Sequence, residues 1–149
     1  RHHMVYHIED VCFTGDVGGI RIPNSGKGLH VRIPAVPPEF HLESWRESMN
    51  RLRHIPFQRI APTHFGIYDD PIDHIEAVLE GLDELELWME KVFPAADNPD
   101  EIRGKFYTWM ETQAEESDLN KARVDSYEAA IPTSMSVGGM WRYWQKFRS

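Results

Sequence analysis

The sequence has one cysteine, a deficit of basic residues and no long hydrophobic run. Cys12 has no second cysteine to pair with, so an internal disulfide is excluded, and its apolar neighbours predict a buried thiol. The 16 Lys and Arg face 24 Asp and Glu, a net charge of −8 that disfavours binding to phosphate backbones. No segment approaches the roughly 18 apolar residues that span a bilayer. We therefore expect a cytoplasmic protein that binds neither nucleic acids nor membranes.

The order of strand and helix signals predicts a mixed α/β (α+β) fold. Short apolar runs bounded by turn residues indicate strands at residues 3–10, 11–13 and 57–61, and shorter extended segments at 20–22 and 30–33. The polar break between the first two runs predicts an antiparallel hairpin.

Two amphipathic helices are expected on either side of the strand at 57–61. Apolar residues recur every three or four positions over 42–52, in a helix that ends before Pro56. The Asp-Pro pair at 70–71 predicts an N-cap and the first residue of a helix that runs to about residue 93. Within this second helix we expect His74 to be exposed.

From residue 94 onward the sequence is typical of helices alone. Asn98 is placed as an N-cap, with Pro99 at the first helical position and Glu101 completing a capping box. Helices are predicted at 99–117, 118–131 and 137–147. The aromatic residues of the last helix are expected to pack in the core rather than to hold a ligand. We divide the chain into an αβ part, residues 1–93, and a helical extension, residues 94–149.

Two metal-competent side chains each follow a short apolar strand and are followed closely by glycine. Asp16 comes after the run at 11–13, with Gly18 two residues later, and His64 comes after the run at 57–61, with Gly66 behind it. A carboxylate can bind or bridge metal ions, and a neutral imidazole is a preferred zinc or iron ligand. Taken singly, Asp16 can also be a turn residue and His64 a loop histidine bonded to a carbonyl group. Together they predict a metal site.

These segments resemble motifs of the metallo-β-lactamase-fold hydrolases. Residues 11–16, Val-Cys-Phe-Thr-Gly-Asp, are similar to that family's "apolar strand, Gly-Asp" motif, and residues 62–66, Pro-Thr-His-Phe-Gly, are similar to its last ligand motif. Residues 1–6 are similar to the segment that follows the family's third ligand motif. The resemblance covers residues 1–90.

The resemblance implies a fold, a metal site and a reaction. It implies half of an αββα sandwich, with Asp16 bridging two divalent metal ions and His64 binding the second. Zinc is the first choice for these ions, with iron or manganese as alternatives. The metals of the intact enzyme would activate a water that attacks a small-molecule substrate. Because members of this family cleave many substrates, the fold does not identify this one.

The chain departs from the family in one large respect, because the His-x-His-x-Asp-His signature is absent. A catalytic metal needs at least three protein ligands, so two residues do not complete a site. We therefore expect the C-terminal portion of such an enzyme, inactive as an isolated chain. Its partner would be the N-terminal half of the same domain or a second copy of the chain.

Two alternatives stay open at the level of sequence. The chain can be a non-catalytic binding or assembly module, or an accessory subunit, in which Asp16 and His64 are structural. The adjacent His2 and His3 can be native residues near the site or the remnant of a cloning tag. Because adjacent residues of a strand point to opposite faces, both are not expected to reach one site.

Overall fold

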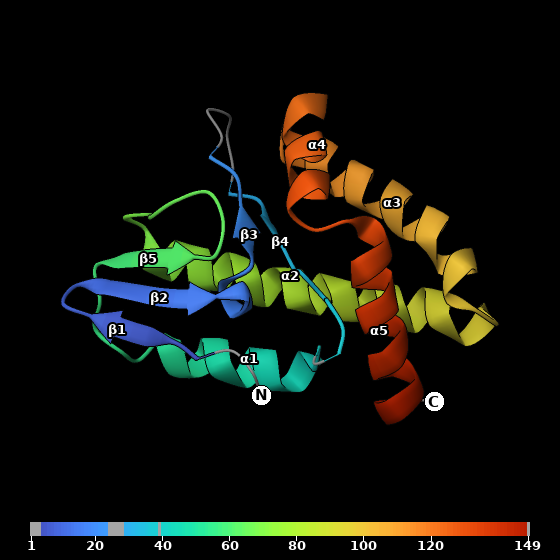
Figure 1. Cartoon of the computed structure of the whole chain (residues 1–149), viewed down its shortest axis with the longest axis horizontal. Coiled ribbons are helices and arrows are strands. Elements are labelled where there is room, and N and C mark those ends of the chain that lie inside the picture. The colour runs from blue at the N-terminus through green and yellow to red at the C-terminus, as the bar shows by residue number, and fades with distance from the viewer. Residues whose placement is uncertain (1–3, 24–28, 39, 149) are drawn as a thin grey trace.

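The computed structural model describes residues 4–23, 29–38 and 40–148, which form a mixed α+β fold (Figure 1). The predicted general class is therefore confirmed. The strands are β1 (Tyr6–Ile8), β2 (Val11–Gly15), β3 (Ile20–Arg21), β4 (Val31–Arg32) and β5 (Arg59–Pro62). The helices are α1 (Leu42–Leu52), α2 (Pro71–Val92), α3 (Pro99–Glu116), α4 (Lys121–Ala130) and α5 (Thr133–Phe147), with two short 3-10 helices, η1 (Asp16–Gly18) and η2 (Phe93–Ala95). None of the helices in the described ranges combines the length and hydrophobicity that a bilayer span requires.

The site is positioned by a three-stranded sheet with the order β1-β2-β5. β1 pairs antiparallel with β2, which confirms the predicted hairpin, although β1 has only three residues. β2 pairs parallel with β5, and Cys12 lies opposite Ile60. The chain reaches β5 from β2 through the small β3–β4 sheet and α1. The parallel pairing places the C-terminal ends of β2 and β5 at one edge of the sheet.

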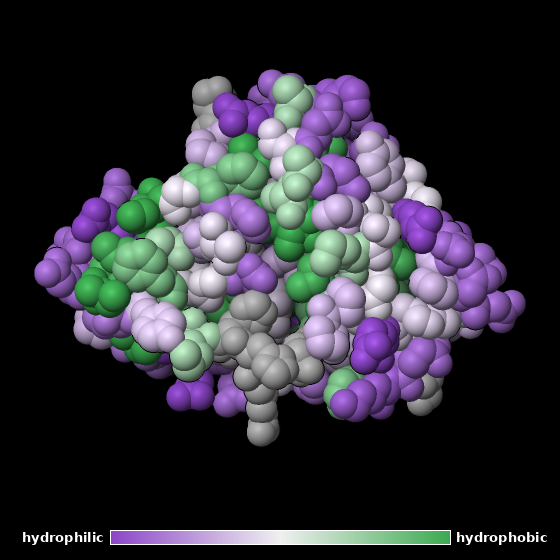
Figure 2. Space-filling view, viewed as in Figure 1, coloured by the Kyte–Doolittle hydropathy of each residue, from purple (hydrophilic) through white to green (hydrophobic). Residues whose placement is uncertain are grey.

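The two faces of this sheet differ in burial. Cys12 and Ile60 are fully buried and belong to a cluster that includes apolar residues of α1 and α2. As predicted, the Cys12 side chain is a buried thiol, whose pKa is raised to about 11 by burial. On the other face, Tyr6, Ile8 and Phe13 expose 53%, 58% and 40% of their surface. In Figure 2, hydrophobic residues gather over these strands at the left of the view.

The helices that cover the buried face follow the predicted apolar stripes. In α1 the buried residues are Leu42, Trp45, Met49 and Leu52, each of which contributes roughly 1.5–3 kcal/mol by leaving water. In α2 the buried stripe runs from His74 to Met89. His74 is fully buried, so the prediction that it is exposed is wrong.

Caps define the ends of the C-terminal helices. Asn98 accepts hydrogen bonds from the backbone N–H groups of Asp100 and Glu101, at 3.0 and 3.2 Å, which confirms it as the N-cap of α3. α5 begins at Thr133, four residues before the predicted start. The Glu128 carboxylate accepts hydrogen bonds from the Thr133 backbone N–H and hydroxyl, at 2.8 and 2.6 Å, and so caps the added turn.

The C-terminal helices pack onto the αβ part. One hydrophobic cluster includes residues of β2, α1, α2, α3 and α5. The Tyr143 and Phe40 rings lie 5.5 Å apart, and Phe93 contacts Trp141 and Trp144 at 6.0 and 5.2 Å between ring centroids. These contacts confirm core packing for Trp141, Tyr143 and Trp144, but the same prediction is wrong for Phe147, which is 46% exposed.

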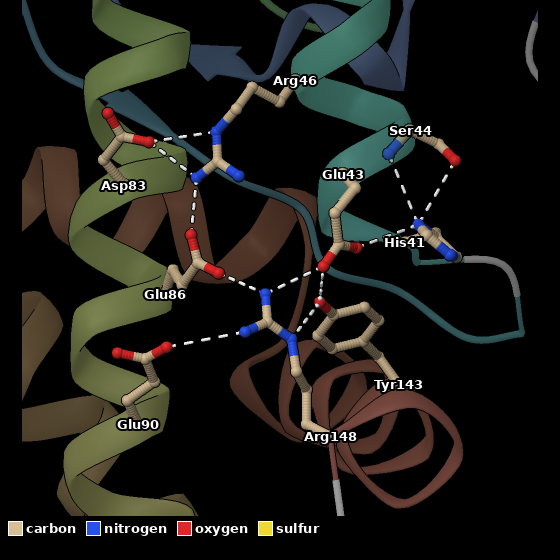
Figure 3. A network of polar contacts seen from close by, with 9 residues as sticks. All are labelled: His41, Glu43, Ser44, Arg46, Asp83, Glu86, Glu90, Tyr143 and Arg148. Atoms are coloured by element: carbon tan, nitrogen blue, oxygen red, sulfur yellow. Dashed lines mark hydrogen bonds and ion pairs between the residues drawn. The ribbon is translucent and has the colours of Figure 1, made fainter.

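A polar network joins the end of α5 to α1 and α2 (Figure 3). Arg148 donates hydrogen bonds to Glu43 at 2.8 Å and to Tyr143 Oη at 2.9 Å, and it also binds Glu86. The Tyr143 hydroxyl in turn donates to Glu43 at 2.7 Å. Arg46 donates to Glu86 at 2.8 Å, so one carboxylate of α2 is shared by two guanidinium groups. Residues far apart in the sequence are thereby tied together around one helix end.

Candidate metal site at the ends of two parallel strands

Asp16 is held at the end of β2 by a tightly packed turn. It is the first residue of η1, and the Gly19 N–H donates a hydrogen bond to the Asp16 carbonyl oxygen at 2.9 Å. A Cβ atom on Gly18 would lie 2.0 Å from Thr14 Oγ1, so only glycine fits there. Gly19 has φ +72°, a left-handed conformation that L side chains rarely adopt. These glycines fix the direction in which the chain leaves Asp16.

His64 lies at the neighbouring strand end, two residues after β5. The residue between them, Thr63, donates a hydrogen bond from its hydroxyl to Asp16 Oδ1 at 2.8 Å. Gly15 lies opposite Pro62 in the β2–β5 register, so the two motifs leave the sheet side by side. Asp16 and His64 are both partly exposed. The structure thus brings the two predicted segments together at one solvent-accessible edge of the sheet.

His74 supports this edge from behind. Its Nε2 lies 2.7 Å from the Gly18 carbonyl oxygen, and because a carbonyl only accepts, Nε2 carries the proton. Nδ1 has no hydrogen-bond partner among the described residues, which fits a neutral ring with a bare Nδ1. Burial lowers the pKa of His74, although the hydrogen bond to Gly18 opposes this shift. His74 therefore acts as a neutral donor that anchors the Asp16 turn to α2.

A second contact fixes the segment between His64 and α2. The Asp70 carboxylate accepts hydrogen bonds from both Nη atoms of Arg21, at 2.6 and 2.9 Å. The Tyr68 hydroxyl donates to the Arg21 carbonyl oxygen at 2.6 Å. Asp70 stands at the predicted N-cap position of α2, but its side chain makes no capping hydrogen bond. Its carboxylate is used instead to join the start of α2 to β3.

The chemistry of Asp16 and His64 fits a divalent metal ion, but two donors do not complete a site. A carboxylate oxygen and an imidazole nitrogen are ligands that zinc, iron and manganese accept. Across residues 4–23, 29–38 and 40–148, no group of three or more His, Cys, Asp or Glu side chains is placed to hold a metal. His2 and His3 lie outside the described residues. A metal ion held by Asp16 and His64 would need further donors from other groups.

Sequence reasoning did not identify Thr63 or His74 as parts of this edge. The signal for His74 was present, because it precedes Ile75 and lies four residues before Val78, on the apolar stripe of α2. Thr63 had no such signal, since its role depends on how β2 and β5 are paired.

No model of a known protein family and no curated protein sequence matches this chain. The fold and the geometry of the sheet edge are therefore the basis for a functional assignment.

Proposed function

We propose that this chain is the C-terminal portion of a metal-dependent hydrolase of the metallo-β-lactamase type, inactive as the isolated chain. The observation that carries the proposal is the hydrogen bond between Thr63 and Asp16. It joins two motifs that are 47 residues apart and that resemble the metal-binding motifs of that family. In the proposal Asp16 and His64 bind zinc, or else iron or manganese, and the intact enzyme holds two ions.

The residues of the chain have separate roles in this proposal. The Thr63 hydroxyl donates to Asp16 Oδ1 and so orients the carboxylate that would bind the metal. His74 holds Gly18, and through it the turn that carries Asp16. A divalent metal bound at such a site supplies Lewis-acid activation of water for attack on a small-molecule substrate.

The exposed face of the three-stranded sheet also supports the proposal. Tyr6 lies opposite Phe13 in the β1–β2 pair, so both side chains stand on the same face, and Ile8 follows on that face two residues later. Exposed apolar surface of this kind marks an interaction site. In an αββα sandwich a second sheet covers this face, and the N-terminal half of the domain or a second copy of the chain would supply it.

Zinc titration of the full chain tests the metal site. We expect zinc to bind, with the affinity reduced at least about tenfold by Asp16→Asn and by His64→Ala, because each removes one of two ligands. His54→Ala is the matched control, since His54 is an exposed histidine elsewhere on the surface. Unchanged zinc affinity in both site variants would overturn the proposal. Hydrolytic turnover by the isolated chain at the rate of a complete enzyme would contradict its incompleteness.

A second candidate function, an assembly module without catalysis, is favoured by the same exposed face. Size-exclusion chromatography of Phe13→Lys separates the two candidates when it is combined with the zinc titration. Phe147→Lys is the control, because Phe147 is similarly exposed but lies on α5. Self-association that Phe13→Lys abolishes, together with zinc binding that Asp16→Asn and His64→Ala leave intact, would select the assembly module.

A further inference from the structure

A small cavity lies between β4 and the helices α2, α3 and α4, formed by residues other than those of the strand-end site. Its volume is about 40 Å³, and apolar side chains make up much of its wall, among them Leu85, Phe106, Trp109 and Met110. By the same measure one water needs about 10–15 Å³, so the cavity has room for roughly three water-sized groups.

Arg32 lines this cavity with a charge that is almost wholly buried. Its side chain is 8% exposed, and neither Nε nor Nη2 has a hydrogen-bond partner among the described residues. Nη1 forms an ion pair with Glu128 Oε2 at 3.6 Å, a distance too long for a hydrogen bond, and the Glu128 carboxylate accepts hydrogen bonds from Thr133. Burying an unsatisfied guanidinium is costly, so a group that satisfies Nε and Nη2 gains free energy.

Nε and Nη2 are the two nitrogens from which an arginine donates a side-on, bidentate pair of hydrogen bonds to a carboxylate. Elsewhere in this protein, Arg59 donates from Nε and Nη2 to the two carboxylate oxygens of Asp10, at 3.0 and 2.9 Å. Arg32 has the same pair of donors without an acceptor. The chemical group that matches the two free donors of Arg32 is therefore a carboxylate, as Asp10 is for Arg59.

The other polar groups of the cavity favour a small monoanion over a dianion. Glu111 and Glu128 line the wall, and their charges repel a dianion such as hydrogen phosphate about twice as strongly as a monoanion. His30 lines it as a neutral ring, because burial and the charge of Arg32 lower its pKa to about 4. The apolar wall favours an alkyl group, and the volume limits its length.

We propose that this cavity binds a short aliphatic carboxylate of the size of acetate or propionate. Nε and Nη2 of Arg32 each donate to one of its oxygens, and its alkyl group lies among Phe106, Trp109 and Met110. Both nitrogens are closed to solvent, so binding requires the Arg32 guanidinium group to rotate toward the cavity that the residue lines. This inference is independent of the proposed metal site.

Isothermal titration of the full chain with sodium propionate, at constant ionic strength, tests the proposal. We expect saturable binding to one site, and no saturable binding of propionamide, which has the same shape but lacks the charge. Arg32→Met should weaken propionate binding at least about tenfold through the loss of two charge-assisted hydrogen bonds. Arg59→Met is the matched control, since its guanidinium is already paired with Asp10, and should leave the affinity unchanged.

A second variant keeps the test independent of any effect of Arg32 on folding. Ala114 is buried on α3 and lines the cavity, so Ala114→Val fills the space while keeping Arg32. A folded Ala114→Val chain should no longer bind propionate. Equal binding of propionamide, undiminished binding by folded Arg32→Met or Ala114→Val, or saturation by phosphate but not by propionate would each overturn the proposal.

Discussion

Gly139 of α5 crosses the carbonyl group of Ala35 so closely that a Cβ atom on Gly139 would lie 2.0 Å from the Ala35 oxygen. It would also lie 2.7 Å from the carbonyl carbon of Val36. Both neighbours are backbone atoms, which cannot swing aside as the end of a flexible side chain does. The absence of a side chain at this one position therefore lets α5 lie against the segment that follows β4.

The neighbouring glycines of α5 give a direct test of this packing. Gly139→Ala should lower the free energy of unfolding by about 3 kcal/mol, the upper range for overpacking, because backbone must move. Gly138→Ala is the control, since nothing lies within 4 Å of its Cβ position, and it should gain about 0.8–1 kcal/mol from helix propensity. Urea denaturation measures both. Equal effects of the two substitutions would show that α5 does not pack as described.

The network around Arg148 should contribute measurably to stability. Arg148→Met leaves Glu43, Glu86 and Tyr143 without a shared donor, so we expect a loss of about 1–2 kcal/mol in the free energy of unfolding. Arg103→Met, which breaks an exposed pair with Asp100 within one helix, should cost about 0.5 kcal/mol or less. Similar losses for the two variants would contradict a structural role of the Arg148 network.

The free energy of unfolding should fall as the pH drops from about 6.5 to about 4. The pKa of His30 is about 4 in the folded chain because burial and Arg32 disfavour its charged form, against 6.5 as its ordinary value. Between these values the unfolded chain binds a proton that the folded chain does not. The contribution of His30 to stability is therefore fully present above pH 6.5 and is lost progressively as the pH falls toward 4. The largest contribution from His30 is roughly 3 kcal/mol.

Urea denaturation of His30→Gln at pH 8, 6 and 4.5 checks the size of this contribution. The variant should lose less stability than the original chain over that interval. His74, whose pKa burial also lowers, keeps part of the effect in the same direction. An identical loss in both proteins would rule out His30 as a source of the pH dependence.

His74 should stabilise the Asp16 turn specifically as well as the fold in general. His74→Ala removes a buried ring and leaves the Gly18 carbonyl without its partner, so we expect a loss of about 2–4 kcal/mol. In His74→Ala, deuterium exchange of the Gly19 amide, which donates to Asp16, should speed up more than exchange of the β2 amides does. His54→Ala, an exposed change, should alter neither measurement. Unchanged exchange at Gly19 in His74→Ala would refute the anchoring role.

The parts of the fold that follow local patterns were predictable from sequence. The stripe of α1, the Asn98 cap and the hairpin depend on residues within a few positions of each other, and all three are confirmed. The early start of α5 was missed because Glu128, which caps it, lies five residues before Thr133 and is no ordinary cap signal.

The candidate site was predictable only in part, for a related reason. Asp16 and His64 could be proposed because each follows its own strand, which is a local property. That the two strand ends are neighbours depends on the β2–β5 pairing, and the contact of Thr63 with Asp16 depends on its exact register. Arg32 could not be identified from the sequence as a ligand-binding residue, because whether its guanidinium has hydrogen-bond partners depends on what surrounds it in space.

The parallel pairing of β2 with β5 has a consequence for how this molecule reaches its native state. Between the two strands the chain must wind through β3, β4 and α1 before Ile60 can meet Cys12. Closing so long a loop carries an entropic cost that only later contacts offset, which slows folding. During synthesis, a nascent chain that ends before Thr63 contains Asp16, but its β2 strand still lacks the complete β5 strand as a partner. The candidate site can therefore form only after both of its strands have left the ribosome.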